Sequence, residues 1–471
     1  MIKKLIQRYY NQAVEDACTR ILYFFNTIDT YFLVAGIASV VIYSAMRPAG
    51  DHALINAALA AVVTWVIFKV SDFYPLFLAF APVYLLFLFK SSHLSLHAAL
   101  SLLVINLALF ASIQFLFMSI PESIVARDTS IGIRKIWNSI FTIAPTAVSL
   151  PISVSFSTIY SLTVLAQPNP LDSNGFLFWL TISSAALITH RFKPRSFVSA
   201  DFRPEIKRRI SDCVIVLNID GCRLDRFYEA ALPFLTSLQK RGSYFPEGLQ
   251  TVYRALTNPA FASILTGAPP EIHGITSNNL GQVIKVEALP DLVKTKLYGS
   301  MHVKHFSKPS WDTRIVSLPR HSIYKSDDIM FDLLKKDLSE DDGAALFIAD
   351  ISEVDFLGHA YGSESAQYLE ALRRADRRIA LFFEWLEKNG LIDKATVIVC
   401  SDHGIVKIDH SYLLFAAERH VPFIIAGRGI KQDNPLKFNA SIMDIAPTVS
   451  YLLGIRYPAD CRGRVFVEAL K

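Results

Sequence analysis

Residues 212–220 read DCVIVLNID, and this stretch decides the fold of the second half of the chain. An apolar run that begins at Cys213 and ends in an acid at Asp220 is typical of a strand buried on both faces of a parallel sheet. Three later segments repeat the pattern: residues 344–351 (AALFIADI), 395–400 (ATVIVC) and 421–427 (VPFIIAG). We therefore predict four buried strands in this half.

Segments with helical periodicity alternate with these strands. Residues 231–241 place three leucines on one helical stripe, residues 365–389 are long and amphipathic, and residues 442–453 predict a closing helix. The arginines of the second segment fall on its predicted solvent side: Arg373, Arg374, Arg377 and Arg378. The alternation predicts an α/β domain over residues 211–471, with a mostly parallel sheet sandwiched by helices. Residues 281–342 are less regular, and we expect a cap or insertion there.

The first 200 residues have a different composition. About a tenth of them are charged, against about a quarter of residues 201–471, which is the usual soluble value. Six apolar runs follow one another: residues 31–45, 54–68, 74–89, 96–117, 141–166 and 176–188. The fourth run is long enough to cross a bilayer, and the first three are long enough once their flanking residues are included. The fifth contains Pro145 and Pro151 and the sixth is short, so both are weaker candidates for spans. We predict an all-α transmembrane domain of about six helices over residues 29–190, with five helices as the alternative.

The placement of basic residues predicts the sidedness of this multi-pass cell-membrane protein. With six spans, only Arg47 and Lys90 fall on the side opposite the N-terminus. The positive-inside rule then makes residues 1–28 a cytoplasmic segment and places the basic juxtamembrane linker, residues 191–210, and the α/β domain in the cytoplasm. With five spans, the α/β domain moves to the extracytoplasmic side. The net charge of +5 is mild and lies beside apolar segments, which indicates contact with the bilayer and no nucleic-acid partner.

The cysteines and the glycine motifs exclude several classes of protein. Five cysteines without CxxC spacing cannot all pair within one chain, so we expect free, buried thiols. The chain has neither a GxGxxG nor a GxxxxGK[ST] motif, so the nucleotide-fold fingerprints are absent.

Aspartates and histidines cluster where the predicted strands end. They are Asp220, Asp355 and His359 in a DxxGH motif, Asp402 and His403 in SDHG, and His410. Because ligand sites in such sheets form outside the carboxyl ends of the strands, we expect these side chains to converge. Carboxylate and imidazole ligands fit two divalent ions, with Zn²⁺ preferred and Mn²⁺ as the alternative. Two ions about 3.5–4 Å apart can clamp a phosphoryl group, which predicts a two-metal hydrolytic centre.

Thr257 is the candidate nucleophile. It precedes Asn258-Pro259 and a stretch of small residues with helical character, so we expect it near a helix N-terminus. That position offers backbone N–H groups and a positive dipole end to an anion. A hydroxyl group close to a metal ion ionises readily and can attack phosphorus.

The second half resembles the alkaline phosphatase superfamily, and within it the type I phosphodiesterase/nucleotide pyrophosphatase family. Stretches that match in order are VIVLNIDGCRLD, TVYRALTNPAFASILTG, PPEIHGITSNN, DFLGHAYG, VIVCSDHG, HSYLLFAAERHVPFIIAGRG and the closing DIAPTVSYLLGI. The resemblance covers about residues 211–460 and implies an alkaline phosphatase-like catalytic domain.

The resemblance also implies roles for single residues. One metal would be held by Asp220, Thr257, Asp402 and His403, and the other by Asp355, His359 and His410. Thr257 would form a phosphothreonyl intermediate, and the Asn278 amide would hold a phosphoryl oxygen. His420 competes with His410 as the third ligand of the second metal; His410 is preferred because HSY stands where the family has HGY. His273 also matches, and we interpret it as a structural turn histidine.

The sequence departs from the family around the nucleophile. Leu256 stands where lysine is common, and Asn258 and Ala260 replace an aromatic residue and an asparagine. These departures weigh against a nucleotide substrate and leave the metal ligands intact.

Three functional hypotheses follow. The leading one is a membrane-embedded, metal-dependent phosphodiesterase that acts on a phospholipid or lipid-linked phosphodiester. The second is a transferase that passes a phosphoryl headgroup from Thr257 to a lipid or glycan acceptor, as the resemblance to multi-span lipoteichoic acid synthases and phosphoethanolamine transferases implies. The third is a non-enzymatic membrane protein with an inactive hydrolase domain, but all seven expected ligand positions hold competent residues.

Overall fold

The computed structural model describes residues 173–278, 282–340, 342–407, 410–413 and 415–471. Two compact units divide the chain: α10 (Ser173–Phe192) belongs to one, and Pro194–Lys471 belong to the other, called here the α/β unit. The sixth predicted span, residues 176–188, lies within α10, and the other five lie outside the described residues. No described helix is both long enough and apolar enough to cross a membrane.

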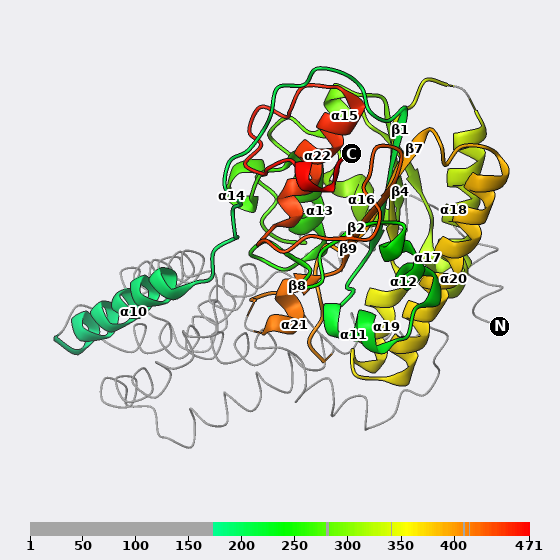
Figure 1. The fold of residues 1–471 in the computed structure, drawn as a ribbon. Coiled ribbons are helices and arrows are strands. Elements are labelled where there is room, and N and C mark those ends of the chain that lie inside the picture. The colour runs from blue at the N-terminus through cyan, green and yellow to red at the C-terminus, as the bar shows by residue number, and fades with distance from the viewer. Residues whose placement is uncertain (1–172, 279–281, 341, 408–409, 414) are drawn as a thin grey trace. The chain divides into compact units, whose positions relative to one another are not determined.

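An eight-stranded sheet forms the centre of the α/β unit (Figure 1). Its strands, in spatial order, are β10 (Asn434–Pro435), β2 (Gly242–Tyr244), β9 (Phe423–Gly427), β7 (Ala395–Cys400), β1 (Cys213–Ile219), β6 (Leu346–Ile351), β4 (Thr295–Gly299) and β5 (Asp312–Ile315). The pairs from β7 through β5 are parallel, whereas β9 runs antiparallel to both β7 and β2. A separate two-stranded sheet joins β3 (Leu249–Gln250) to β8 (His420–Val421). The predicted α/β class with a mostly parallel sheet is confirmed.

Helices cover both faces of the sheet (Figure 1). One face packs against α11 (Leu224–Glu229), α12 (Pro233–Lys240), α18 (Ile323–Ser339), α19 (Glu353–Tyr361) and α20 (Ala366–Lys388). The other packs against α13 (Thr257–Thr266), α15 (Leu289–Leu292), α16 (Met301–Phe306) and α22 (Ile445–Leu453). Short helices complete the unit: α14 (Pro270–His273), α17 (Leu318–His321), α21 (Ala416–Arg419) and the 3₁₀ turns Ile442–Asp444 and Val467–Ala469.

Strand β1 shows why the apolar run was a reliable signal. Val214 and Val216 lie in one core cluster, while Ile215, Leu217 and Ile219 lie in the cluster on the opposite face. Side chains of a strand alternate between the faces of the sheet, so a strand covered by helices on both sides needs apolar residues at every position. The segments predicted from the same pattern became β6, β7 and β9.

The structure differs from the expected cap or insertion over residues 281–342. Strands β4 and β5 lie in this segment, and β4 pairs with β6 in the central sheet. Strand β4 carries the buried Lys296, whose ammonium lies 3.1 Å from Asp337 and 2.8 Å from Asp342. A paired lysine inside a short strand conceals the apolar pattern from which a buried strand is recognised.

The predicted solvent side of the 365–389 helix also needs a correction. The Arg378 side chain is only 11% exposed; its guanidinium pairs with Glu353 and lies 3.5 Å from Asp327. Both carboxylates are buried, so this arginine compensates charge beneath the helix α20 and is not solvated.

The segment predicted as a juxtamembrane linker, residues 191–210, is part of the α/β unit from Pro194 onward. The Ser199 hydroxyl donates to Asp444 at 2.5 Å, and the Phe202 carbonyl accepts a hydrogen bond from Val465 N–H at 2.9 Å. The four cysteines among the described residues are free thiols, as expected: Cys213, Cys222, Cys400 and Cys461.

Candidate metal centre

Three parallel strands deliver most of the predicted ligands to one edge of the sheet. Strands β7, β1 and β6 are neighbours and run in the same direction, so their carboxyl ends meet. Asp220 directly follows β1, and Asp402 and His403 follow β7. Helix α19, which begins just after β6, supplies Asp355 and, one turn later, His359. Of the other two predicted ligands, His410 comes from a loop distant from a strand end, and Thr257 is the first residue of α13.

Asp220, Asp402 and His403 form what we call the first group. One ligand atom from each residue lies within 4.8 Å of the others. His403 Nε2 is 3.3 Å from Asp220 Oδ1 and 3.4 Å from Asp402 Oδ2. All three side chains are buried, so the group presents two carboxylates and one imidazole that are shielded from water.

Asp355, His359 and His410 form the second group, with the same mutual limit of 4.8 Å. His359 Nε2 is 3.3 Å from Asp355 Oδ2 and 3.2 Å from His410 Nε2, and His410 Nε2 is 3.8 Å from Asp355 Oδ1. His359 is partly exposed, so this group lies nearer to solvent than the first. It presents one carboxylate and two imidazoles.

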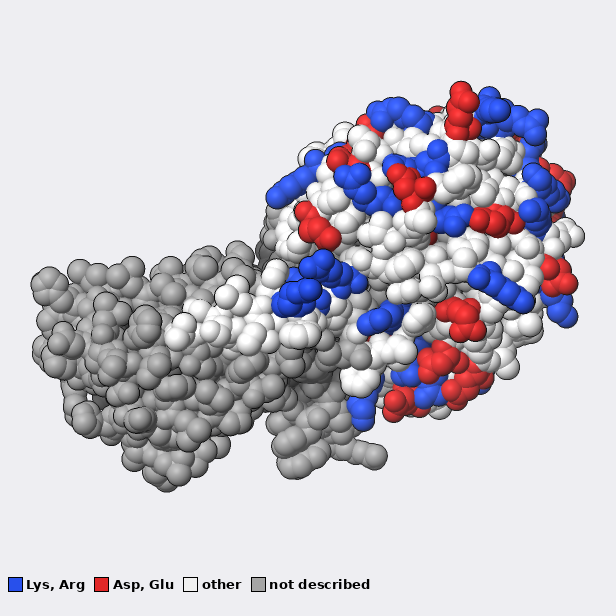
Figure 2. Space-filling view, turned by 60° about the vertical axis from the view of Figure 1, so that its left-hand side comes forward, with Lys and Arg blue, Asp and Glu red and all other residues white. Residues whose placement is uncertain are grey.

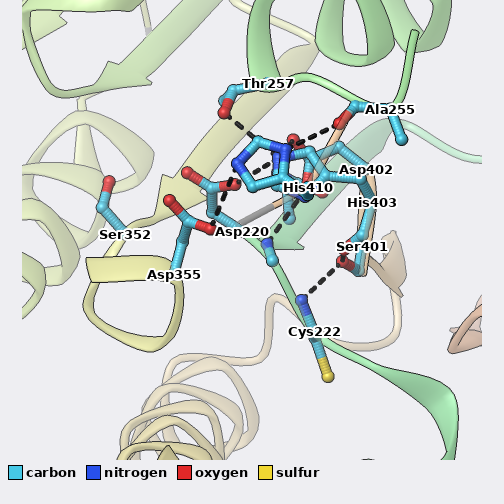
Figure 3. Close-up of polar contacts among 12 residues, drawn as sticks. Asp220, Cys222, Ala255, Thr257, Ser352, Asp355, Ser401, Asp402, His403 and His410 are labelled. Carbon is cyan, nitrogen blue, oxygen red and sulfur yellow. Dashed lines mark hydrogen bonds and ion pairs between the residues drawn. The ribbon is translucent and has the colours of Figure 1, made fainter. Parts of the chain in front are cut away.

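The two groups form a single site with Thr257 (Figure 3). The imidazole rings of His403 and His410 stack with centroids 3.8 Å apart, which joins the first group to the second. Thr257 Oγ1 lies 3.2 Å from His403 Nε2, and the carboxylates of Asp220 and Asp355 point toward the same place. The structure thus brings a hydroxyl group and both sets of candidate ligands within reach of one small substrate group.

Three orphaned oxygens test whether cations fit this site. Asp220 Oδ1, Asp355 Oδ1 and Asp402 Oδ2 are buried and have no hydrogen-bond partner among the described residues. Buried carboxylate oxygens without partners cost free energy, and a metal ion in each group would satisfy them. Since carboxylate oxygen and imidazole nitrogen both ligate zinc and manganese, the residues fit two divalent ions.

The hydrogen bonds of two histidines set which ring nitrogen can bind a metal. His410 Nδ1 is 2.6 Å from the carbonyl oxygen of Ala255, and His403 Nδ1 is 3.2 Å from that of Gly404. A carbonyl only accepts, so both Nδ1 atoms carry the proton. Nε2, which faces the carboxylates, is therefore the nitrogen that can bind a metal ion in each ring.

The electrostatics of the metal-free site differ between the carboxylates. Burial, with repulsion from Asp402 and Asp355, raises the pKa of Asp220 well above its usual value. Burial also raises the pKa of Asp402, although His403 opposes the shift. For Asp355 the effect of burial is outweighed by His359, His410 and His403, which hold its pKa below the usual range. Burial and the neighbouring His403 lower the pKa of His410 well below its usual value.

Helix α13 begins at Thr257, as the sequence predicts, and Asn278 lies beside that end. Asn278 Oδ1 accepts a hydrogen bond from the Asn258 N–H at 2.9 Å. This contact occupies the amide oxygen and leaves the NH₂ end of Asn278 as the donor for an anion. At the start of α13 the Asn258 N–H is used in this contact and Pro259 has no N–H, so the Thr257 N–H is the further donor left for a phosphoryl oxygen.

Two other histidines lie outside the two groups. His420, the competing ligand, is in β8, where its Nδ1 is 3.2 Å from the carbonyl oxygen of Glu247. His273 is fully buried; its Nε2 is 3.0 Å from Ser263 Oγ, and its Nδ1 accepts from the Ile275 N–H at 3.1 Å. These contacts are those of a structural turn histidine.

Several residues that shape the site carry no chemical motif in the sequence. The Ala255 carbonyl orients His410, Ser401 Oγ accepts from the Cys222 N–H at 3.0 Å, and the Tyr368 hydroxyl binds the turn after β1. Gly221 can be recognised in the sequence, because a glycine directly after a strand-ending aspartate indicates a turn. In the structure its φ of +69° favours glycine. The other three act through backbone hydrogen bonds, which depend on the fold and leave no spacing to detect.

Comparisons with known proteins agree with this geometry. Residues 214–313 and 292–424 match the model of the family described as type I phosphodiesterase/nucleotide pyrophosphatase. An uncharacterized pyrophosphatase/phosphodiesterase of Schizosaccharomyces pombe is 26% identical over 231 residues, which are 43% of this chain and 46% of that protein. The bovine ectonucleotide pyrophosphatase/phosphodiesterase family member 3 is 28% identical over 218 residues, 41% of this chain and 25% of its own. The chain thus spans less than half the length of these curated relatives.

Solved structures of low identity were also found. Murine ectonucleotide pyrophosphatase/phosphodiesterase 5 in complex with AMP has a TM-score of 0.45 at 14% identity and covers 52% of this chain and 96% of its own. The alkaline phosphatase PafA has a TM-score of 0.46 at 14% identity and covers 57% of this chain and 100% of its own.

Proposed function

We propose that this chain belongs to the type I phosphodiesterase/nucleotide pyrophosphatase family, whose model matches residues 214–313 and 292–424, and that it hydrolyses a phosphodiester with two divalent metal ions. The observation that carries the proposal is the position of Thr257 Oγ1, 3.2 Å from His403 Nε2 at the junction of the two ligand groups. Zinc is the proposed ion, held by the first group with Thr257 and by the second group.

The proposed reaction has two displacements at phosphorus. When bound, the ions supply positive charge that favours ionisation of a nearby hydroxyl and offsets charge on the phosphoryl oxygens. Thr257 loses its proton to solvent and its Oγ attacks phosphorus; the bond from phosphorus to the leaving alcohol breaks, and the alcohol takes up a proton from water. Water then attacks phosphorus, the bond to Thr257 Oγ breaks, and Thr257 regains a proton.

The chain also provides donors for the charge that develops in each displacement. These donors are the Thr257 N–H at the start of α13 and the NH₂ group of Asn278, which lies beside it. Fixed donors aimed at developing negative charge lower the barrier without reorganising in the reaction. Asn278 is therefore proposed as the residue that holds a phosphoryl oxygen.

We propose a phospholipid or lipid-linked phosphodiester as the substrate and a multi-pass membrane location for the chain. The support is the series of apolar runs over residues 31–188 and the uneven distribution of basic residues between its two predicted sides. This distribution favours a cytoplasmic location for the α/β unit. On the face shown in Figure 2, the described Lys and Arg side chains are interspersed with Asp and Glu, unlike a surface built for nucleic acid. The relatives named as nucleotide pyrophosphatases make a nucleotide diester the competing substrate.

The first experiment measures hydrolysis of bis(4-nitrophenyl) phosphate and of 4-nitrophenyl phosphate by the purified full-length chain, with zinc or with chelator. We expect chelator-sensitive cleavage with a preference for the diester. Thr257→Ala should lower kcat/KM by at least about a thousandfold, because no other hydroxyl takes the place of the nucleophile. Thr257→Ser is the matched control and should keep most of the activity.

The outcomes separate the alternatives. A preference for the monoester would make the chain a phosphatase. Equal activity of Thr257→Ala and wild type would show that Thr257 is not the nucleophile. If the diester is cleaved, a second panel compares phospholipids in detergent with a dinucleotide at equal concentration. Faster cleavage of the dinucleotide would contradict the lipid substrate.

The membrane side needs its own measurement. The thiols of Cys222, Cys400 and Cys461 are buried, so an exposed reporter is required. Asn389→Cys, at the solvent-exposed end of α20, can be labelled in intact cells with a membrane-impermeant maleimide. If the α/β unit is cytoplasmic, we expect the introduced cysteine to be protected from the maleimide in intact cells and labelled after lysis. Labelling in intact cells would contradict a cytoplasmic location.

A further inference from the structure

Tyr368 is a buried phenol that takes no part in the proposed chemical steps. It lies on α20 and is fully buried in the core. Its hydroxyl donates to the Gly221 carbonyl at 2.6 Å and accepts from the Arg223 N–H at 3.0 Å. Both partners are backbone groups of residues 220–223, the turn that carries Asp220. Tyr368 therefore ties this turn to a long helix of the scaffold.

The same turn touches a carboxylate of each ligand group. The Gly221 N–H donates to Asp402 Oδ1 of the first group at 3.3 Å. A Cβ atom on Gly221 would lie only 2.5 Å from Asp355 Oδ1 of the second group, so the turn packs directly against that side chain. A displacement of the turn would therefore move Asp220 and change the surroundings of Asp402 and Asp355 together.

We propose that Tyr368 is a positioning residue that sets the separation of the two ligand groups, an inference that rests on the proposed two-metal function. A phosphoryl clamp needs ions about 3.5–4 Å apart, so small shifts of the turn matter. Hydrogen bonds behind metal ligands commonly change metal affinity or activity by about 10–100-fold. Tyr368 acts through the backbone of the turn and touches neither metal nor substrate.

The test compares Tyr368→Phe with Tyr298→Phe in the full-length chain. Tyr298 is the matched control because it is also fully buried in the same core cluster, and its hydroxyl donates to Asp337 at 2.7 Å. Zinc stoichiometry and affinity are measured by competition with a chromophoric chelator, and melting of the metal-free proteins is followed by circular dichroism. We expect Tyr368→Phe to weaken at least one zinc site by tenfold or more, while Tyr298→Phe binds zinc as the wild type does.

Kinetics provide a second readout. Tyr368→Phe should lower kcat for the diester with little change in KM, because the clamp is distorted while the substrate contacts persist. If both Tyr variants bind zinc with wild-type affinity, or both weaken it equally, the inference is overturned. A wild-type chain that does not bind two ions would overturn the proposed function as well, so the two failures are distinguishable.

Gly221→Ala keeps the inference testable if Tyr368→Phe does not fold. It reaches the same turn from the side of Asp355, where the added Cβ has no space and the positive φ is unfavourable. We expect weaker zinc binding here too. Wild-type zinc affinity in a folded Gly221→Ala chain would contradict coupling of the turn to the ligands.

Discussion

The first and second ligand groups occupy the same edge of the sheet but have different chemical character. The first offers two carboxylates and one imidazole, all buried; the second offers one carboxylate and two imidazoles, with His359 partly exposed. Thr257 Oγ1 lies next to His403 of the first group. The first group thus concentrates negative charge beside the proposed nucleophile, whereas the second is closer to neutral and to solvent.

This difference teaches how one site can divide its work. A cation is favoured most where two buried carboxylates each have an oxygen without a hydrogen-bond partner, so the first group should hold its ion more tightly. An ion beside Thr257 would favour the ionised hydroxyl, while an ion at the second group would act on the leaving side of the phosphoryl group. The predictions below break or sharpen this comparison, in order of decreasing effect.

The largest effect is expected from removing one ligand of the first group. Asp402→Ala should lower zinc content from two ions to one and diester hydrolysis by at least about a thousandfold, since several kcal/mol of stabilisation are lost. His359→Ala should also lose one ion but reduce activity less, by about a hundredfold. Zinc content by mass spectrometry and kcat/KM check both. Equal losses in the two variants would contradict the division of work.

The next prediction concerns the third ligand of the second group. His410→Ala should lose one zinc ion and about a hundredfold in kcat/KM, because His410 Nε2 faces His359 and Asp355. His420→Ala is the control, since His420 hydrogen-bonds the Glu247 carbonyl in β8. Loss of zinc in the His420 variant, with retention in the His410 variant, would reverse the assignment.

A smaller effect, of opposite sign in the two groups, is expected in the stability of the metal-free protein. Asp220 has a raised pKa, so its charge opposes folding above its unfolded pKa, and Asp220→Asn should raise Tm at pH 7. Asp355 has a lowered pKa; its stabilisation is present at pH 7 and is lost as pH falls below its unfolded value of about 3.9. Asp355→Asn should therefore lower Tm at pH 7.

Each shift should be at least about 2 °C, because one unit of pKa corresponds to about 1.4 kcal/mol. Thermal melts in excess chelator provide the measurement. Shifts of the same sign in both variants would show that the two groups do not differ electrostatically.

The smallest effect separates a structural histidine from the ligands. Burial lowers the pKa of His273 to about 3, against 6.5 in the unfolded chain, so its stabilisation is complete above pH 6.5 and declines as pH falls toward 3. His273→Asn should leave zinc content unchanged and reduce stability at pH 7. The gap to wild type should narrow by up to about 1.4 kcal/mol per pH unit below pH 6.5, measured by urea unfolding without metal. A gap that is constant with pH would contradict this.

Most of the candidate ligands could be predicted from the sequence because they follow apolar strands. Strands β1, β6 and β7 are covered on both faces, and this requirement produces continuous apolar runs that end shortly before Asp220, Asp355 and Asp402. The structure brings these aspartates together with His359, His403 and His410, and places Thr257 at the start of a helix. Their roles as ligands and nucleophile stay predictions.

Other features were hidden because tertiary contacts override the local pattern. Strand β4 contains the charged Lys296, which is stable there only because Asp337 and Asp342 lie beside it. The helical periodicity places Arg378 on the solvent side, but in the structure it pairs with the buried Glu353. The Tyr368 hydroxyl and the Ala255 carbonyl act through backbone hydrogen bonds between segments far apart in the chain. No residue type or spacing signals such contacts.

The stereochemical course at phosphorus tests the central claim most directly. A phosphorothioate diester of known configuration is hydrolysed by the zinc-loaded chain in ¹⁸O-labelled water, and the configuration of the product is determined by NMR. Attack by Thr257 followed by attack of water makes two in-line displacements, so we predict overall retention. Inversion would mean a single displacement by water and would contradict the role of Thr257 as the nucleophile.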